Sequence, residues 1–351
     1  MADKADPVMG RENAASTRPA PVSNFEFPES ILSGATADVY FQRAQTILKQ
    51  EGLNPLVTME VFSNGTGVLC GMREALDLLH MVLNKGALVW AAEEGQPFRP
   101  KHVVLRIKDT YSPFGLYETA VLGILAQSSG WATAARECVD AAAGVPVISF
   151  GARHVHPRVA DILDYAAIVG GCIAGSTTLG SQLHGLAPSG TMPHALILIF
   201  GDTVRAALAF DNHMPVEVPR VVLVDTFKDE AEESIRVAEA LGAKLFGVRL
   251  DTPAERGRVT ADLVKEVRAR LDLAGFHHVK VIVSGGLTPD RIRYFRDSAA
   301  PVDSFGVGSF VSGARPIDFT GDLKEIDGVP VAKRGRIPGL TPSDGLRRIE
   351  F

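Results

Sequence analysis

The chain has 351 residues, 46% of them hydrophobic and 22% charged, which is ordinary for a globular protein and excludes global intrinsic disorder. Its formal net charge is −5, from 36 basic and 41 acidic side chains, so it lacks the positive field that nucleic-acid binding requires. The length predicts about two domains.

Residues 1–24 are rich in Pro, Ala, Ser and Asn and contain no apolar run of the kind a signal peptide needs, so we expect a disordered tail. The uncharged stretch 165–201 is interrupted by glycines and prolines and is not expected to span a membrane. The three cysteines form no C-x-x-C pair and are predicted to be buried thiols. These features predict a cytoplasmic protein with no membrane partner.

The first structured region is predicted to be an α+β sandwich domain over residues 25–143. Apolar residues recur at helical spacing around 40–48 and again from Met72 to Leu83. Runs typical of strands occupy 56–62 and 102–107, and an alanine-rich helix is expected over 117–142.

From residue 144 to 320 short apolar runs alternate with helical patterns, which is typical of β/α units around a parallel sheet. The sequence therefore predicts an incomplete β/α (TIM-like) barrel, and the final segment, 321–351, is expected to return to the N-terminal domain. The seven predicted strands are 145–150, 172–174, 195–200, 221–224, 244–250, 279–283 and 304–307.

Glycine and polar residues gather where these runs end. In β/α barrels the chemistry lies at the carboxyl ends of the strands. Two such turns, Ser284-Gly285-Gly286 and Gly306-Val307-Gly308-Ser309, follow or close the last two runs, where a barrel commonly binds phosphate. The alternative is that they are only tight turns. No P-loop and no G-x-G-x-x-G is present.

Charged residues at other strand ends extend this pattern. Arg249 and Asp251 are two residues apart and point the same way, so they form either a substrate grip or a plain salt bridge. Arg153 and His154 suit a cationic phosphate cluster, with metal ligation by His154 and His156 or a structural ion pair as alternatives. His194, taken alone, is equally compatible with a structural role. No G-x-S-x-G nucleophile motif is present.

Several long segments resemble the nicotinate phosphoribosyltransferase family of the type II fold, especially its shorter archaeal-like branch. The likeness covers residues 36–336, and its segments keep the family's order and spacing. They are FGARHVHP (150–157), SGTMPHALI (189–197), VVLVDTFKDE (221–230), GVRLDTPAERG (247–257), VIVSGGLTPDRI (281–292), GVGSFVSGARPIDFTGD (306–322) and VPVAKRG (329–335).

The resemblance implies roles for individual residues. It implies a homodimer or higher homo-oligomer in which Tyr40 of a partner subunit stacks on the pyridine ring, and a His194 that is phosphorylated by ATP. Asp251 is implied to hold ribose hydroxyls or Mg²⁺, and no zinc module is expected because no cysteine follows Cys172. The implied nicotinate contacts are Thr191 and Arg249, and the implied phosphoribosyl pyrophosphate (PRPP) contacts are Arg153, His154, Ser284, Gly285, Gly286, Gly306, Gly308 and Ser309.

The implied reaction transfers phosphoribose from PRPP to nicotinate, with ATP assistance, in NAD biosynthesis. One alternative is quinolinate phosphoribosyltransferase, which has the same fold, releases CO₂, and should need more cations around the ring. The SGTMPH segment favours nicotinate, because its histidine belongs to the ATP-coupled branch. Another alternative is a non-catalytic phosphate-binding barrel, which would not need Tyr40 or Arg249.

Overall fold

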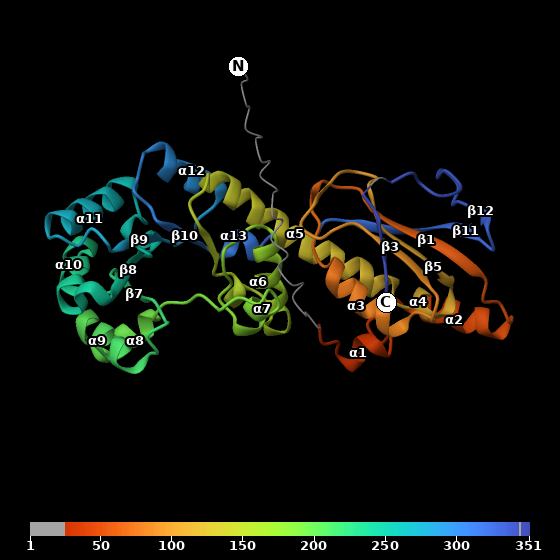
Figure 1. The fold of residues 1–351 in the computed structure, drawn as a ribbon, viewed down its shortest axis with the longest axis horizontal. Coiled ribbons are helices and arrows are strands. Elements are labelled where there is room, and N and C mark those ends of the chain that lie inside the picture. The colour runs from red at the N-terminus through yellow and green to blue at the C-terminus, as the bar shows by residue number, and fades with distance from the viewer. Residues whose placement is uncertain (1–24, 344) are drawn as a thin grey trace, which may run out of the picture.

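A computed structural model describes residues 25–343 and 345–351, so the predicted tail at residues 1–24 lies outside the described part. Figure 1 shows an N-terminal domain on the right and a β/α domain on the left, with the long helix α5 (Glu118–Ala142) running between them. The first half of α5 packs in the N-terminal core through Val121 and Leu125. Its second half packs in the other core through Trp131 and Cys138.

The N-terminal domain is built on an antiparallel six-stranded sheet with the order β12-β11-β1-β5-β3-β13. Strands from the two ends of the chain share this sheet, because β11 pairs with β1 and β13 pairs with β3. Its strands are β1 (Leu56–Ser63), β3 (Leu88–Ala91), β5 (Val103–Thr110), β11 (Phe319–Ile326), β12 (Val329–Pro330) and β13 (Arg347–Ile349), and a separate pair joins β2 (Gly67–Val68) to β4 (Pro97–Phe98).

Strand β1 is buried on both faces after its first residue. Alternate residues of a strand point to opposite faces, so Val57, Met59 and Val61 join the core formed with α3 (Met72–Val82) and α5. On the other face Glu60 accepts two hydrogen bonds from Arg106 of β5, at 2.9 and 2.6 Å. Glu60 also accepts from the backbone N–H of Thr341 at 3.1 Å, which ties the returning C-terminal segment to the sheet.

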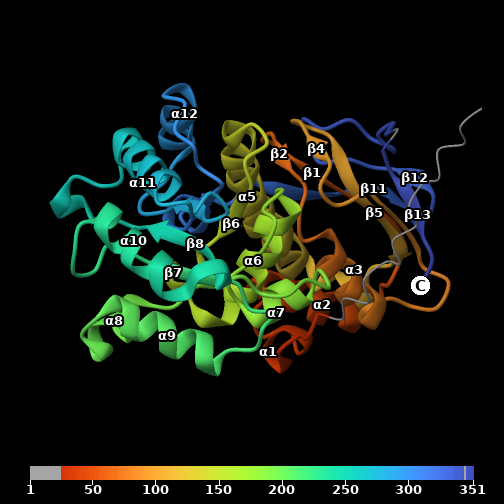
Figure 2. The same ribbon diagram turned by 60° about the vertical axis from the view of Figure 1, so that its left-hand side comes forward.

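The second domain contains a parallel five-stranded sheet with the order β6-β10-β9-β8-β7. Its strands are rich in Val, Ile and Leu, as is typical of parallel strands that are buried on both faces. The strands are β6 (Val147–Ser149), β7 (Arg220–Leu223), β8 (Leu245–Leu250), β9 (Lys280–Val283) and β10 (Ser304–Val307). Figure 2 shows helices α10, α11 and α12 along the outside of these strands.

The remaining α-helices connect or flank these strands. In the N-terminal domain they are α1 (Glu29–Leu32), α2 (Val39–Gln50) and α4 (Ser112–Gly115). In the second domain they are α6 (Ala160–Val169), α7 (Thr178–Gln182), α8 (His194–Phe200), α9 (Thr203–His213), α10 (Glu230–Leu241), α11 (Ala261–Leu273), α12 (Pro289–Asp297) and α13 (Ser309–Ser312).

Two of the seven predicted barrel strands are wrong. Residues 195–200 form helix α8, which begins after Pro193. A short, uniformly apolar run does not distinguish a buried strand from a helix by its periodicity. Here Ile197 is buried while Leu198 and Ile199 are 59% and 81% exposed, as expected for a helix with one packed face. Residues 172–174 form only a single bridge, from Ala174 to Ile148.

The fold class predicted from the sequence is confirmed: an incomplete parallel β/α barrel accompanies an N-terminal α+β domain. The three cysteines are buried and unpaired, as expected. Among the described residues, no helix is long and apolar enough to cross a membrane.

Arg106→Ala should lower the free energy of unfolding by about 3–5 kcal/mol, because it leaves the buried Glu60 carboxylate without its cation. Denaturant unfolding measures the loss. The matched control is Arg270→Ala, which removes an exposed pair with Glu266 and should cost no more than about 0.5 kcal/mol. Equal losses in the two variants would contradict the role given to Glu60 and Arg106.

Candidate active site

The carboxyl ends of the five parallel strands bring most of the predicted site residues together. Arg249 lies near the end of β8, Ser284 directly follows β9, and Gly308 directly follows β10. The sheet order places β9 between β8 and β10, so the two glycine turns are neighbours in space as well as in the predicted series. A polar depression lined by backbone N–H groups is therefore expected at this edge.

Arg249 is the most constrained side chain of the site. Its Nε donates to Ser284 Oγ at 2.8 Å, and its Nη1 donates to Thr191 Oγ1 at 3.1 Å. Its Nη2 lies 3.5 Å from Asp251 Oδ2, and the guanidinium carbon stands 4.5 Å from the centre of the Phe150 ring. Burial lowers the pKa of Arg249, and the nearby carboxylates of Asp251 and Asp225 oppose that shift.

Asp251 is held by the same network. Ser284 Oγ donates to Asp251 Oδ1 at 2.8 Å, so this serine connects the predicted arginine and aspartate. The substrate-grip and salt-bridge interpretations of this pair are therefore compatible, because the ion pair fixes the direction of the guanidinium. Among the described residues, no group of three or more His, Cys, Asp or Glu side chains is arranged to hold a metal ion.

The glycines beside these residues leave no room for larger side chains. Gly285 and Gly286 have φ angles of +91° and +63°, which a side chain would strain. A Cβ on Gly306 would overlap the Phe150 ring, on which Arg249 stacks. A Cβ on Gly308 would lie 3.0 Å from His154, so His154 is adjacent to this turn.

His194 begins helix α8 and pairs with Asp225, which follows β7. Its Nε2 lies 3.1 Å from both carboxylate oxygens of Asp225. The Asp225 side chain is 2% exposed and the His194 side chain 39% exposed. The hydrogen bond to Asp225 raises the pKa of His194, although burial acts in the opposite direction.

Sequence reasoning left Asp225 out of the predicted site, although it follows a barrel strand as Asp251 does. It also missed Phe150 and Arg258. A Cβ on Gly286 would collide with Nη1 of Arg258. The expectation that site residues follow the carboxyl ends of barrel strands could have found Asp225. The ring of Phe150 offers no such signal, because an aromatic residue at a strand end is usually part of the core.

Tyr40 lies apart from this cluster, and Ser309, which directly follows Gly308, borders a cavity on the α5 side. Tyr40 is on α2, is 58% exposed, and its hydroxyl donates to Asp38 Oδ2 at 3.1 Å. Figure 1 places α2 at the end of the molecule away from the barrel. Ser309 is exposed and lines a cavity of about 460 Å³ with Thr133 and Arg315, between α13 and α5.

Arg153, by contrast, lies close enough to Arg249 to lower the pKa of Arg249 further.

Comparison with known proteins identifies the family. Residues 38–129 match the N-terminal domain of quinolinate phosphoribosyl transferase, and residues 131–322 match its C-terminal domain. The chain therefore belongs to the quinolinate phosphoribosyl transferase family. A solved structure named nicotinate-nucleotide pyrophosphorylase, from Pyrococcus furiosus, is 42% identical, with a TM-score of 0.82 over 93% of this chain and 85% of that one.

Curated relatives carry names of two kinds. "Nicotinate phosphoribosyltransferase pncB1" of Mycobacterium tuberculosis is 34% identical over 69% of this chain and 54% of its own length. The chain thus spans about half the length of that relative. A probable carboxylating nicotinate-nucleotide pyrophosphorylase of Archaeoglobus fulgidus is 26% identical over 74% of this chain and 92% of its own.

Asp225→Asn should lower the pKa of His194 toward the ordinary value of about 6.5, because it removes the charged hydrogen-bond acceptor. A raised pKa in the folded state means that this pair stabilises the fold below the unfolded pKa and loses that contribution as the pH rises through the folded pKa. Titration of the His194 ring by NMR measures the shift. Asp251→Asn, which acts on His194 only at a distance, should lower the pKa less; an equal effect would contradict the pairing.

Proposed function

We propose that this chain transfers the phosphoribosyl group of PRPP to nicotinate and releases pyrophosphate. The observation that carries the proposal is Arg249, a single guanidinium fixed by Thr191, Ser284 and Asp251 beside the two glycine turns. A rigid guanidinium suits bidentate binding of one carboxylate, and adjacent glycine turns suit phosphate oxygens. The Phe150 ring behind Arg249 supports its orientation.

The chemistry needs orientation and charge stabilisation more than a base. The pyridine nitrogen attacks C1 of the ribose with its own lone pair, the C1–O bond breaks, and pyrophosphate leaves with the bonding electrons. Arg249 would hold the acid so that its nitrogen faces C1, and the backbone N–H groups at Gly285, Gly286 and Gly308 would bind phosphate oxygens. Such positioning needs no nucleophile–base pair of the hydrolytic kind.

A magnesium ion could be held here jointly by the protein and by the phosphates of the substrate. Mg²⁺ usually binds proteins through one or two carboxylates together with substrate phosphates. Asp251 supplies one carboxylate at the strand ends, with Oδ1 bound by Ser284 and Oδ2 3.5 Å from Arg249. The ion would neutralise the leaving pyrophosphate. We propose Asp251 as its protein ligand.

His194 is proposed to accept a phosphoryl group from ATP. Because the Asp225 carboxylate can only accept, the Nε2–H of a neutral His194 ring donates to it and Nδ1 keeps its lone pair. Nδ1 would form the P–N bond as ADP departs. Asp225 would then stabilise the charge that develops on the ring.

A second copy of the chain is proposed to complete the site. Helix α2 buries none of its residues, and Val39, Tyr40 and Ile47 are each more than half exposed. The exposed ring of Tyr40 is therefore available to a partner subunit. Stacking of this ring on a bound pyridine would make the site depend on a homodimer or larger homo-oligomer.

Quinolinate is the second candidate acceptor. The names of the matching family domains and of some relatives favour quinolinate over nicotinate. The matching family domains carry the quinolinate name, and a carboxylating nicotinate-nucleotide pyrophosphorylase, run in reverse, transfers phosphoribose to quinolinate with loss of CO₂. Quinolinate brings a second carboxylate and calls for further cations. The four lysines of the barrel pair elsewhere, so the further cations beside the site are Arg153, which acts on Arg249, and Arg258, which lies against Gly286.

A direct assay decides between the two acids. The protein is given PRPP, Mg²⁺ and either nicotinate or quinolinate, and mononucleotide, pyrophosphate and CO₂ are measured. We expect turnover with nicotinate and none with quinolinate. Arg249→Lys should raise KM for nicotinate by about tenfold or more, because lysine lacks the bidentate fork. Turnover of quinolinate alone would overturn the proposal, and binding of PRPP without turnover would indicate a non-catalytic barrel.

His194→Ala should lose most of the stimulation by ATP and keep basal transfer, because the phosphoryl acceptor is gone while Arg249 and the glycine turns remain. Initial rates with and without ATP measure this. His213→Ala, at the exposed end of α9, is the control and should leave both rates unchanged. Undiminished ATP stimulation in the His194 variant would refute its role.

A further inference from the structure

The segment 175–193 carries Thr191 and leads to His194, yet residues 165–201 contain no charged side chain apart from histidines. Because the segment has no acidic or basic side chains apart from histidines, it depends on hydrogen bonds, on packing and on residues outside the segment to keep its conformation. Its beginning is anchored by Asp164 of α6, which accepts from the backbone N–H groups of Ser176 at 2.9 Å and Thr177 at 2.7 Å. That anchor belongs to the barrel.

The next residue of α6, Tyr165, holds the middle of the same segment. The His184 ring stacks on the Tyr165 ring with centroids 4.4 Å apart and an interplanar angle of 20°. His184 Nε2 lies 3.2 Å from the backbone carbonyl of Tyr165, so this nitrogen carries the proton and donates. Burial lowers the pKa of His184, which keeps the ring neutral at pH 7.

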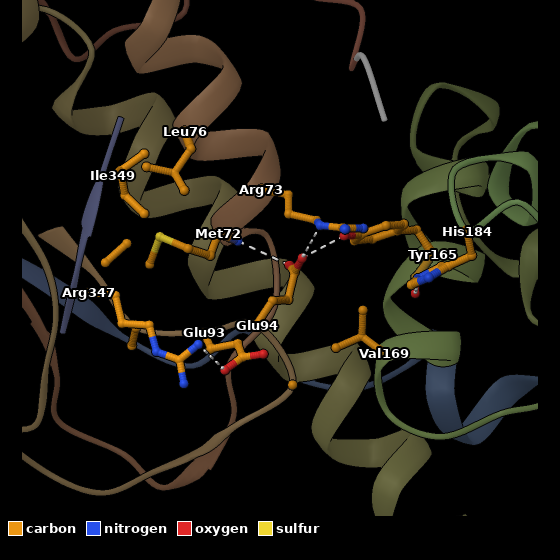
Figure 3. A pocket seen from close by; sticks show the side chains of 13 residues that line it. Met72, Arg73, Leu76, Glu93, Glu94, Tyr165, Val169, His184, Arg347 and Ile349 are labelled. Atoms are coloured by element: carbon orange, nitrogen blue, oxygen red, sulfur yellow. Dashed lines mark hydrogen bonds and ion pairs between the residues drawn. The ribbon is translucent and has the colours of Figure 1, made fainter. Parts of the chain in front are cut away.

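The other end of Tyr165 reaches the N-terminal domain. Its hydroxyl donates to Glu94 Oε2 at 2.5 Å. Glu94 Oε1 in turn accepts from the backbone N–H groups of Gly71 at 2.6 Å and Met72 at 3.1 Å, where it caps helix α3. Figure 3 shows the Glu94 carboxylate joined by dashed lines to Arg73 and to Tyr165, with His184 beside the tyrosine ring.

An open cavity of about 460 Å³ adjoins these groups, and Tyr165 and His184 line it together with Val169 and Leu76. Side chains facing a cavity lack packing on that side. The stacking on Tyr165 and the hydrogen bond to the Tyr165 carbonyl therefore restrain the His184 ring, while the His184 backbone N–H donates to the Ser181 carbonyl at 3.1 Å.

We propose that Tyr165 is a positioning residue that couples the N-terminal domain to the active-site segment, through Glu94 on one side and His184 on the other. This role requires no contact between Tyr165 and substrate. Its effect passes from His184 to residues 185–193 and so to Thr191, which bonds Arg249 at 3.1 Å, and to His194. The coupling to acceptor binding rests on the proposed function, whereas the restraint on the segment does not.

Hydrogen exchange tests the restraint without any assay of activity. The Ser189 N–H donates to the Gly175 carbonyl at 2.8 Å, and the Leu186 N–H donates to Ser181 at 3.0 Å. His184→Ala should speed exchange of these amides by about tenfold, the combined worth of one stacked pair and one hydrogen bond. Tyr165→Phe keeps the ring and removes only the bond to Glu94, and should speed exchange by about fivefold. Leu179→Ala, exposed on α7, is the control and should change nothing.

Two further measurements separate positioning from general stability. His184→Ala should lower the pKa of His194 measured by NMR titration, because the hydrogen bond from His194 to Asp225 is then less well aligned. The same variant should raise KM for the acceptor acid more than KM for PRPP. Unchanged exchange in both variants overturns the proposal. An effect in His184→Ala but not in Tyr165→Phe overturns the link to the N-terminal domain. Faster exchange with unchanged His194 titration and unchanged KM overturns the positioning role. Failure of the wild-type protein to transfer to either acid counts against the proposed function alone.

Discussion

The arrangement of the site depends on keeping the Arg249 guanidinium charged and directed while most of its surface is removed from water. Four groups accomplish this, and they come from four different segments: Thr191 before α8, Asp251 after β8, Ser284 after β9 and Phe150 after β6. Each would lose its partner if one strand of the sheet were displaced. The parallel sheet is therefore the framework that makes a fixed guanidinium possible.

The same constraint explains the glycines around it. Gly306 must lack a side chain so that the Phe150 ring can lie beside Arg249, and Gly285 adopts a positive φ within reach of Asp251. Under the proposed function, the backbone N–H groups of these turns would bind the phosphate oxygens beside the arginine. The guanidinium, the aromatic ring and the glycine turns thus depend on one another for their positions.

The two domains share structure in both directions along the chain. Helix α5 enters both cores, and β11 and β13 return to the sheet that β1 begins. Glu94, Tyr165 and His184 form a smaller bridge of the same kind. An N-terminal domain tied to the barrel at these points can influence the strand-end segments without contributing a side chain to the cluster around Arg249.

The sequence by itself determined the alternation of strands and helices, the strand-end position of both glycine turns, and the common direction of Arg249 and Asp251. These features depend on spacing along one element, where periodicity and strand direction decide the outcome. It could not determine that residues 195–200 coil into a helix, because a uniformly apolar run satisfies either geometry until its neighbours fix which face is covered. Only the tertiary structure paired His194 with Asp225, placed Phe150 under Arg249, and left Tyr40 far from the barrel. The contacts of His194 with Asp225 and of Phe150 with Arg249 join segments separated by dozens of residues. Their geometry arises only when the strands have assembled side by side.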